Sequence, residues 1–122
     1  MITDAPRIIT SRFDDADSYT LARYEATGGY QALRKALGMG PAAVAEEVRT
    51  ASLLGRGGAG FPAGVKWGLT PDDVWPRYLV VNGDESEPGT YKDRLLMERD
   101  PHQLIEGVLL ASYAIGCGQA FL

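Results

Sequence analysis

A glycine-rich stretch bracketed by two cations is the part of this sequence best suited to chemistry. Residues 54–67 read LGRGGAGFPAGVKW, with Arg56 near the start and Lys66 near the end. Glycine lacks a Cβ, so such a loop lets a ligand approach the main chain closely. Exposed backbone N–H groups and cations together suit an anionic phosphate. The stretch therefore indicates either a phosphate or nucleotide site or a flexible turn, and the loop by itself fits both.

The context of this stretch excludes two familiar nucleotide motifs. From Gly55 the spacing matches G-x-G-x-x-G, but a dinucleotide fingerprint needs a strand before the glycines and a helix after them. Here the preceding segment has helical periodicity, and the following one contains Pro62 and Gly64 and is expected to form a connection over residues 65–76. A Walker loop is excluded because no G-K-S or G-K-T sequence follows.

A cluster of acids follows a short apolar run. The run RYLVV, residues 77–81, is typical of a parallel strand covered on both faces, and ligands bind at the carboxyl end of such strands. The polar residues directly after it are Asn82, Asp84, Glu85 and Glu87. A solvated turn, a magnesium or calcium site without EF-hand spacing, and hydrogen bonding to sugar hydroxyls all remain open for these acids. Lys92 and Arg94 could offset the acids or reach a phosphate.

Hydrophobic periodicity and breaking residues predict the other elements. Residues 1–26 are expected to form an extended arm with at most one short turn. Apolar spacings of three and four predict helices over residues 29–37, 41–54 and 101–116, the last capped by Asp100. A helical turn over 91–98 and a strand from Gln119 complete a strand–helix–strand unit with parallel strands. His102, the single histidine, suits a capping or surface role.

Composition narrows the class of protein. The chain has 122 residues, so it forms one domain at most, and its net charge of −4 argues against non-specific nucleic-acid binding. Its single cysteine, Cys117, can form neither an internal disulfide nor, alone, a metal site. No signal peptide or membrane-spanning run is evident, which favours a cytoplasmic protein. The apolar ending Ala120–Leu122 suggests a fragment of a larger subunit.

Two motifs taken together resemble one known family. GRGGAGFPAGVKW and YLVVNGDESEPGTYKDR, continued by DPHQLIEG, are similar to the FMN-binding domain of the NADH-oxidising flavoprotein subunit of respiratory complex I. The same domain occurs in diaphorase subunits of NAD-linked hydrogenases and formate dehydrogenases. The resemblance covers about residues 52–122, and less specifically residues 1–50. It implies an α/β fold, in which an N-terminal helical arm (1–50) precedes part of a Rossmann-like FMN-binding domain with a parallel sheet (51–122), truncated at its C-terminus.

The resemblance also implies a role for each site residue. FMN would lie between the two motifs, its phosphate and ribityl chain along Gly55, Arg56, Gly57, Gly58 and Lys66. The ribityl and isoalloxazine parts would meet Asn82, Asp84 and Glu85. Phe61 would stack on NADH, and Glu87 would hold its ribose or nicotinamide end. Hydride would pass from NADH to the flavin, and electrons onward through iron–sulfur clusters to quinone.

Partners and departures follow from the same resemblance. The family implies a thioredoxin-like [2Fe–2S] subunit and a large iron–sulfur subunit as partners, at the inner face of the cell membrane without direct insertion. Leu69 stands where the family often has a second aromatic residue. The family's second flavin motif and its [4Fe–4S] cysteines would belong to a missing C-terminal part. A diaphorase subunit, or a phosphate-binding fragment without redox activity, remains an alternative.

Overall fold

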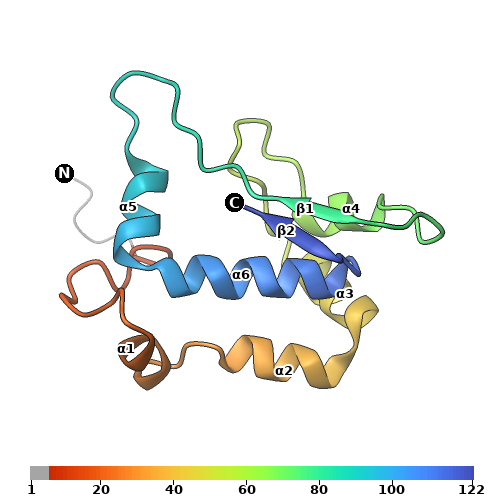
Figure 1. Cartoon of the computed structure of the whole chain (residues 1–122), viewed down its shortest axis with the longest axis horizontal. Coiled ribbons are helices and arrows are strands. Elements are labelled where there is room, and N and C mark those ends of the chain that lie inside the picture. The colour runs from red at the N-terminus through yellow and green to blue at the C-terminus, as the bar shows by residue number, and fades with distance from the viewer. Residues whose placement is uncertain (1–5) are drawn as a thin grey trace.

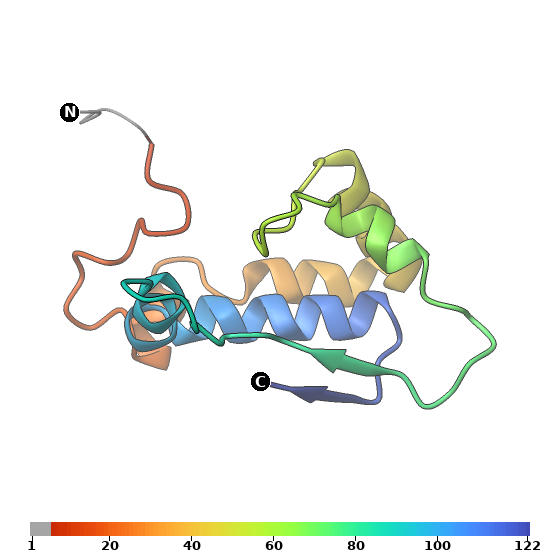
Figure 2. The same cartoon turned by 90° about the horizontal axis from the view of Figure 1, so that it is seen from above.

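One long helix runs through the centre of the molecule. The computed structural model describes residues 6–122, and α6 (Pro101–Ala114) packs against both strands and against α1, α2, α3 and α5. The two strands lie on one side of α6, and α2 and α3 lie on the other (Figures 1 and 2). The other elements, in chain order, are α1 (Leu21–Ala26), α2 (Gln31–Met39), α3 (Pro41–Thr50), α4 (Ala63–Gly68), β1 (Tyr78–Val80), α5 (Lys92–Arg99) and β2 (Gln119–Phe121).

The strand–helix–strand unit is present with the predicted direction. Strands β1 and β2 pair in parallel, with Leu79 opposite Ala120 and Val80 opposite Phe121, and helices α5 and α6 connect them. The α/β class is thereby confirmed, although the described chain is mostly helical and its sheet has only these two strands. The prediction that β1 is covered on both faces is wrong, because Tyr78 and Val80 are 55% and 74% exposed. Only the face that carries Leu79 packs toward α6.

The longer helices form close to their predicted positions, and residues with positive φ angles lie at or near their ends. Tyr30 has a left-handed φ of 59° directly before α2, and Gly40, with φ 87°, ends it. Helix α3 begins at Pro41 as predicted but ends at Thr50 rather than near Leu54, because Ser52 has a φ of 53°. Helix α6 begins at Pro101, and Gly116, with φ 62°, follows its end.

Two six-residue helices were missed by the sequence prediction. Helix α1 lies in the part predicted as an extended arm, where the Thr20 side chain accepts a hydrogen bond from the Arg23 N–H. Residues 1–5 of that arm lie outside the described residues. Helix α4 occupies part of the predicted connection, and it lies so close to α3 that a Cβ on Gly64 would stand 2.5 Å from the Arg49 Cα. Gly64 is therefore a packing residue.

A buried polar network joins the N-terminal arm to α6. The Glu106 carboxylate accepts the Tyr24 hydroxyl and the backbone N–H groups of Tyr30, at 2.8 Å, and Leu33, at 3.0 Å. Burial alone raises the pKa of Glu106, but these hydrogen bonds and the charge of Arg12 outweigh it and lower the pKa. Burial and the same carboxylate raise the pKa of Tyr24. Glu106 therefore supplies the cap that α2 lacks at its own N-terminus.

Two predictions about the start of α6 are corrected by this network. Asp100 occupies the N-cap position, but its side chain makes no cap hydrogen bond and instead accepts one from Arg12 at 3.0 Å. His102 makes no cap hydrogen bond and is half-buried. Its Nδ1 lies 2.9 Å from the Tyr30 hydroxyl, and its ring stacks on Tyr24 with centroids 5.7 Å apart.

Candidate functional site

The glycine loop, residues 55–61, is a closed loop between two helices. An antiparallel bridge between Leu54 and Pro62 closes its base, and the Gly55 N–H donates to the Phe61 carbonyl at 2.8 Å. Gly58 has a φ of 106°, a conformation that favours glycine. The helix before the loop, α3, agrees with the sequence prediction, whereas the helix after it, α4, does not. The dinucleotide fingerprint stays excluded, because a helix and not a strand precedes the glycines.

The tip of the glycine loop leaves room for a ligand beside the main chain. A Cβ built on Gly57 or Gly58 would meet no atom within 4 Å, whereas one on Gly55 would stand 3.2 Å from the Phe61 carbonyl oxygen. Arg56 forms no hydrogen bond or ion pair with any residue from 6 to 122. An exposed cation beside open backbone is the arrangement that a phosphate group requires.

The acidic loop, residues 82–87, is held in shape by its own hydrogen bonds. The Asn82 side-chain oxygen accepts the Asp84 N–H at 2.8 Å, and the Ser86 hydroxyl donates to the Asp84 carboxylate. The two oxygens of Glu85 accept the backbone N–H groups of Asp93, at 2.7 Å, and Arg94, at 3.2 Å. These contacts leave the Asn82 amide nitrogen and the Glu87 carboxylate without a partner among the described residues.

The cations next to the acidic loop have partners of their own. Lys92 pairs with Asp93 at 2.5 Å, and Arg94 pairs with Glu98 at 2.8 Å. The hydrogen bond to Asp93 raises the pKa of Lys92. The hypothesis that Lys92 and Arg94 offset the acids at positions 84–87 is therefore not supported by the ion pairs that form. Both cations instead pair with carboxylates of α5.

The two loops face each other across one open cleft of about 510 Å³. Both project from the same edge of the molecule, the glycine loop before α4 and the acidic loop after β1 (Figure 1). The predicted site residues that line the cleft are Arg56, Gly57, Asn82, Asp84, Glu85 and Glu87. The other lining residues are Ser86, Thr90, Lys92 and Asp93; of these, the sequence singles out only Lys92, as a residue that could reach a phosphate. All four lie within or beside the second sequence motif, which is the signal that could have identified them.

Four predicted residues lie outside the lining of this cleft. Gly55 is at the bridged base of the glycine loop, and Gly58 is at its open tip. Phe61 is 48% exposed at the end of the loop. Lys66 is exposed in the last turn of α4.

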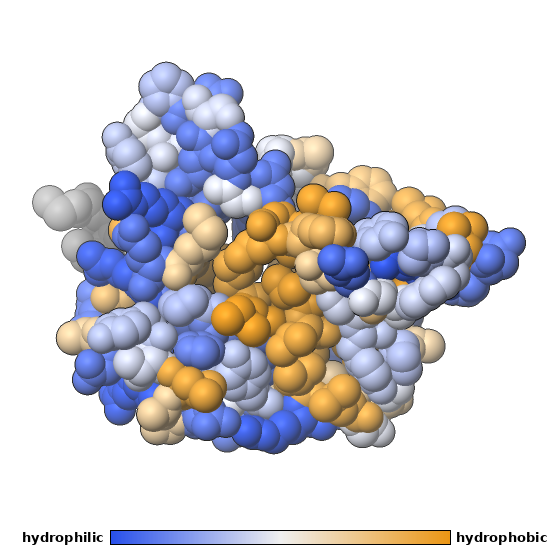
Figure 3. All heavy atoms as spheres, viewed as in Figure 1, coloured by the Kyte–Doolittle hydropathy of each residue, from blue (hydrophilic) through white to orange (hydrophobic). Residues whose placement is uncertain are grey.

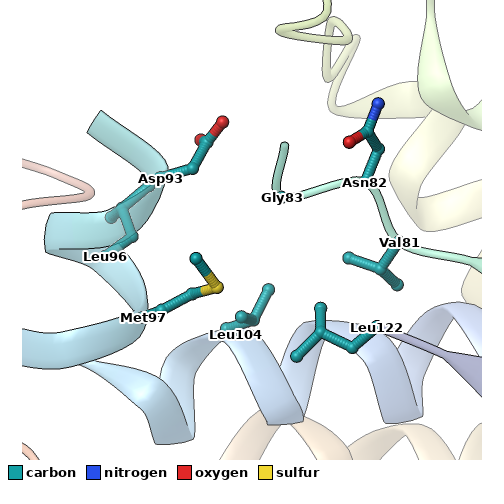
Figure 4. A pocket seen from close by; sticks show the side chains of 8 residues that line it. All are labelled: Val81, Asn82, Gly83, Asp93, Leu96, Met97, Leu104 and Leu122. Atoms are coloured by element: carbon teal, nitrogen blue, oxygen red, sulfur yellow. The ribbon is translucent and has the colours of Figure 1, made fainter. Parts of the chain in front are cut away.

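A small apolar pocket of about 50 Å³ lies under the start of the acidic loop. The side chains of Met97, Leu104, Leu122 and Val81 surround it (Figure 4). A Cβ on Gly83 would stand 3.4 Å from the Met97 sulfur, so glycine lets the loop lie close to α5. The apolar side chains around this pocket lie beneath the acidic loop and pack near its first residues.

Comparison with known proteins identifies the family. Residues 48–122 match the family described as the Nuo51 FMN-binding domain, and the chain belongs to that family. It is a homologue of the F subunit of NADH-quinone oxidoreductase. It is 52% identical over 117 residues to the second F subunit of Rhizobium meliloti and 47% identical over 112 residues to the F subunit of Escherichia coli.

The chain corresponds to only part of these relatives. Those alignments cover 94% and 89% of this chain but 28% and 25% of the two relatives. A solved NAD+-reducing [NiFe]-hydrogenase is similar in structure, with a TM-score of 0.68, 37% identity, and coverage of 94% of this chain and 18% of the other. No helix among residues 6–122 is both long enough and apolar enough to cross a membrane.

Proposed function

We propose that this chain forms one side of an FMN and NADH site in an NADH dehydrogenase flavoprotein subunit. The observation that carries the proposal is the cleft in which the glycine loop faces the acidic loop. The two sequence motifs that resemble the family form its opposite walls. In this interpretation β1 and β2 belong to a larger, Rossmann-like parallel sheet, and residues 51–122 are the first part of the FMN/NADH-binding domain.

The chemistry of the cleft fits FMN at two places. Arg56 and the open backbone at Gly57 suit the phosphate, because both offer donors that no described residue uses. The free amide nitrogen of Asn82 and the carboxylate of Asp84 suit the ribityl hydroxyls. Gly55, Gly58 and Lys66 remain predicted contacts of the phosphate end, and Glu85 of the flavin side. A bound flavin supplies the two-electron acceptance from NADH that no side chain offers.

The remaining roles concern NADH and water. Phe61 presents an exposed ring at the end of the glycine loop, where it can stack on the substrate. Glu87 presents a free carboxylate from the acidic loop, where it can accept hydrogen bonds from ribose hydroxyls. The chain's contribution to the reaction is to orient the two reactants and to exclude water from one side.

Two versions of this proposal differ in the electron acceptor. The similarity to the F subunits of NADH-quinone oxidoreductases supports a role beside iron–sulfur subunits, with electrons passing toward quinone. The similarity to the NAD+-reducing hydrogenase supports a diaphorase role instead. In either version a [4Fe–4S] cluster belongs to a part of the protein beyond these residues. The alternative without redox chemistry is a phosphate-binding domain that holds no flavin. Flavin absorbance of the purified full-length protein, called the full chain below, would distinguish this alternative from the two flavoprotein versions.

Substitution of Arg56 tests the phosphate contact. Arg56→Ala in the full chain should weaken FMN binding at least about tenfold, because a charge-assisted hydrogen bond contributes about 1.5–3 kcal/mol. Lys66→Ala tests the second predicted cation, with a loss of at least several-fold expected. Fluorescence titration of FMN is the measurement. Arg34→Ala is the control, because Arg34 pairs with Glu25 on the surface of the N-terminal part. Unchanged affinity in the Arg56 variant would remove that residue from the site.

A further inference from the structure

Glu85 caps a helix that begins seven residues after it. Helix α5 starts at Lys92, and its N-cap residue, Tyr91, makes no side-chain cap hydrogen bond. The N–H groups of Asp93 and Arg94 are the second and third of the helix, and an N-cap side chain ordinarily accepts from one of them. In this chain the Glu85 carboxylate accepts both of them, at 2.7 and 3.2 Å. Its negative charge also lies at the end of the helix where the macrodipole favours it.

This contact also closes the acidic loop into a ring with the start of α5. Within the ring the Thr90 N–H donates to the Glu87 carbonyl at 3.2 Å, which forms a turn around Pro88 and Gly89. Gly83, just before the ring, lies near Met97 (Figure 4), and a Cβ at Gly83 would stand 3.4 Å from the Met97 sulfur. Asp84 and Glu87, on either side of Glu85, are thus fixed relative to α5 and to the cleft.

We propose that Glu85 is a positioning residue of the FMN and NADH site. Its carboxylate fastens the acidic loop to the N-terminus of α5 and so sets where Asp84 and Glu87 face the cleft. The proposal rests on the proposed function for its ligands, but the tether itself is a property of the protein without ligand. Glu85 and Glu87, two acids of the same loop, therefore have different roles. Glu85 faces the helix amides, whereas Glu87 keeps its carboxylate free for a ligand.

Glu85→Ala in the full chain, without ligand, tests the tether directly. Hydrogen exchange of the Asp93 and Arg94 amides should become at least about tenfold faster, because each loses a hydrogen bond to a charged acceptor. Exchange over residues 84–90 should accelerate with it. Glu98→Ala is the matched control, because Glu98 is an acid of α5 whose one ion pair among residues 6–122 is with Arg94 on the surface. Unchanged exchange over residues 84–94 in the Glu85 variant would overturn the proposal.

A second substitution separates capping from positioning. Tyr91→Ser added to Glu85→Ala gives α5 a local cap without restoring the tether. Slow exchange of the Asp93 or the Arg94 amide should return, because one hydroxyl caps one of the two, while exchange over 84–88 stays fast. The Glu85→Ala single variant should bind FMN weakly and, at saturating FMN, have a raised KM for NADH, and the double variant should keep both defects. Recovery of both ligands in the double variant would show that capping alone suffices, and would overturn the positioning role.

If Glu85 only contacted the flavin and did not tether the loop, the Glu85→Ala variant would give different results. Weak FMN binding with unchanged exchange and an unchanged KM for NADH would assign Glu85 to a flavin contact and overturn the tether. The proposed function fails separately, if the unsubstituted full chain does not bind FMN by fluorescence titration. The exchange comparison decides the tether in either case, because it needs no ligand.

Discussion

At the scale of single residues, the cleft contains side chains of two kinds. Asp84 and Glu85 use carboxylate oxygens in hydrogen bonds that shape the acidic loop. Arg56 and Glu87 make no side-chain hydrogen bond with any described residue, although both line the same cleft. An exposed cation and an exposed acid that the fold does not use are the side chains available to a ligand. The substitutions that test binding should therefore begin with these two.

Glu87 is predicted to act on NADH rather than on FMN. Glu87→Gln in the full chain should raise the KM for NADH several-fold while FMN content stays normal, because the amide is a weaker acceptor for ribose hydroxyls than a carboxylate. Steady-state NADH oxidation and flavin absorbance are the two measurements. Loss of FMN with unchanged NADH kinetics would reverse the assignment.

At the scale of elements, the contact between α3 and α4 positions the glycine loop. The loop leaves α3 and enters α4, and the bridge from Leu54 to Pro62 holds its two ends together. Close approach of the two helices depends on Gly64, because the Arg49 backbone occupies the space of a Cβ. A glycine outside the cleft thus fixes the direction from which the loop reaches it.

Gly64→Ala should disturb this contact. The added methyl would stand 2.5 Å from both Cα and N of Arg49, so the helices must separate, at a cost of about 1–3 kcal/mol in unfolding free energy. Gly68→Ala in the same helix is the control, because its Cβ would meet no atom within 4 Å. Urea unfolding of the full chain and its FMN content are the measurements. Equal stability of the two variants would contradict the packing argument.

The Glu106 network makes the N-terminal attachment sensitive to acid. The pKa of Glu106 is lowered in the folded chain, so its ionised form adds stability above the unfolded value of about 4.3. That stability is lost as the pH falls through the lower, folded pKa. Glu106→Gln should reduce the unfolding free energy at pH 7 by about 1–3 kcal/mol. Urea unfolding should show the gap to the unsubstituted chain narrowing below pH 4. A gap that does not depend on pH would contradict an ionised Glu106.

Sequence periodicity predicted the elements that are long enough to display it. Helices α2, α3 and α6 repeat apolar residues over two or more turns, and β1 and β2 are short runs of β-forming or apolar residues. Helices α1 and α4 have six residues each, too few for a repeat, and Pro62 and Gly64 suggested a loop. Exposure of the outer face of β1 could not be predicted, because a strand's own residues do not specify what covers it.

The site was predictable as two motifs but not as a set of contacts. Gly57 and Asp84 could be assigned from motif resemblance, and both line the cleft. The partners of Glu85 and Glu106 could not be predicted, because each caps a helix from a distant position. Glu106 reaches the Leu33 N–H across a separation of 73 residues, and no local pattern records such a contact. Acids that hold the fold together can therefore be distinguished from acids that are free for a ligand only in the folded structure, and not from the sequence.

At the scale of the whole molecule, one face of the fold is strongly apolar. Figure 3 shows a continuous hydrophobic area in the middle of the face that carries β1 and β2. Exposed apolar side chains of the strands and of α6 include Val80, Phe121, Ile105 and Leu109, and Leu122 follows β2. Parallel sheets are ordinarily covered on both faces, and an apolar patch of this kind marks a surface that another element covers. The relatives are about four times as long as the aligned part, so the rest of their chains is long enough to cover such a face.

Residues 1–122 expressed alone are therefore predicted to bind FMN weakly or not at all and not to oxidise NADH. The apolar face stays exposed to water in this polypeptide, so it contributes no burial free energy to a domain whose net stability is only a few kcal/mol. Among residues 6–122 the cleft is lined by the glycine loop, the acidic loop, Thr90 and the start of α5, so a flavin ring would stay open to water on one side. Flavin titration and NADH–ferricyanide activity of this polypeptide are the measurements, with the full chain as the control. Stoichiometric FMN with fast turnover would show that the two motifs suffice by themselves, and the interpretation of the cleft as half of a site would be wrong.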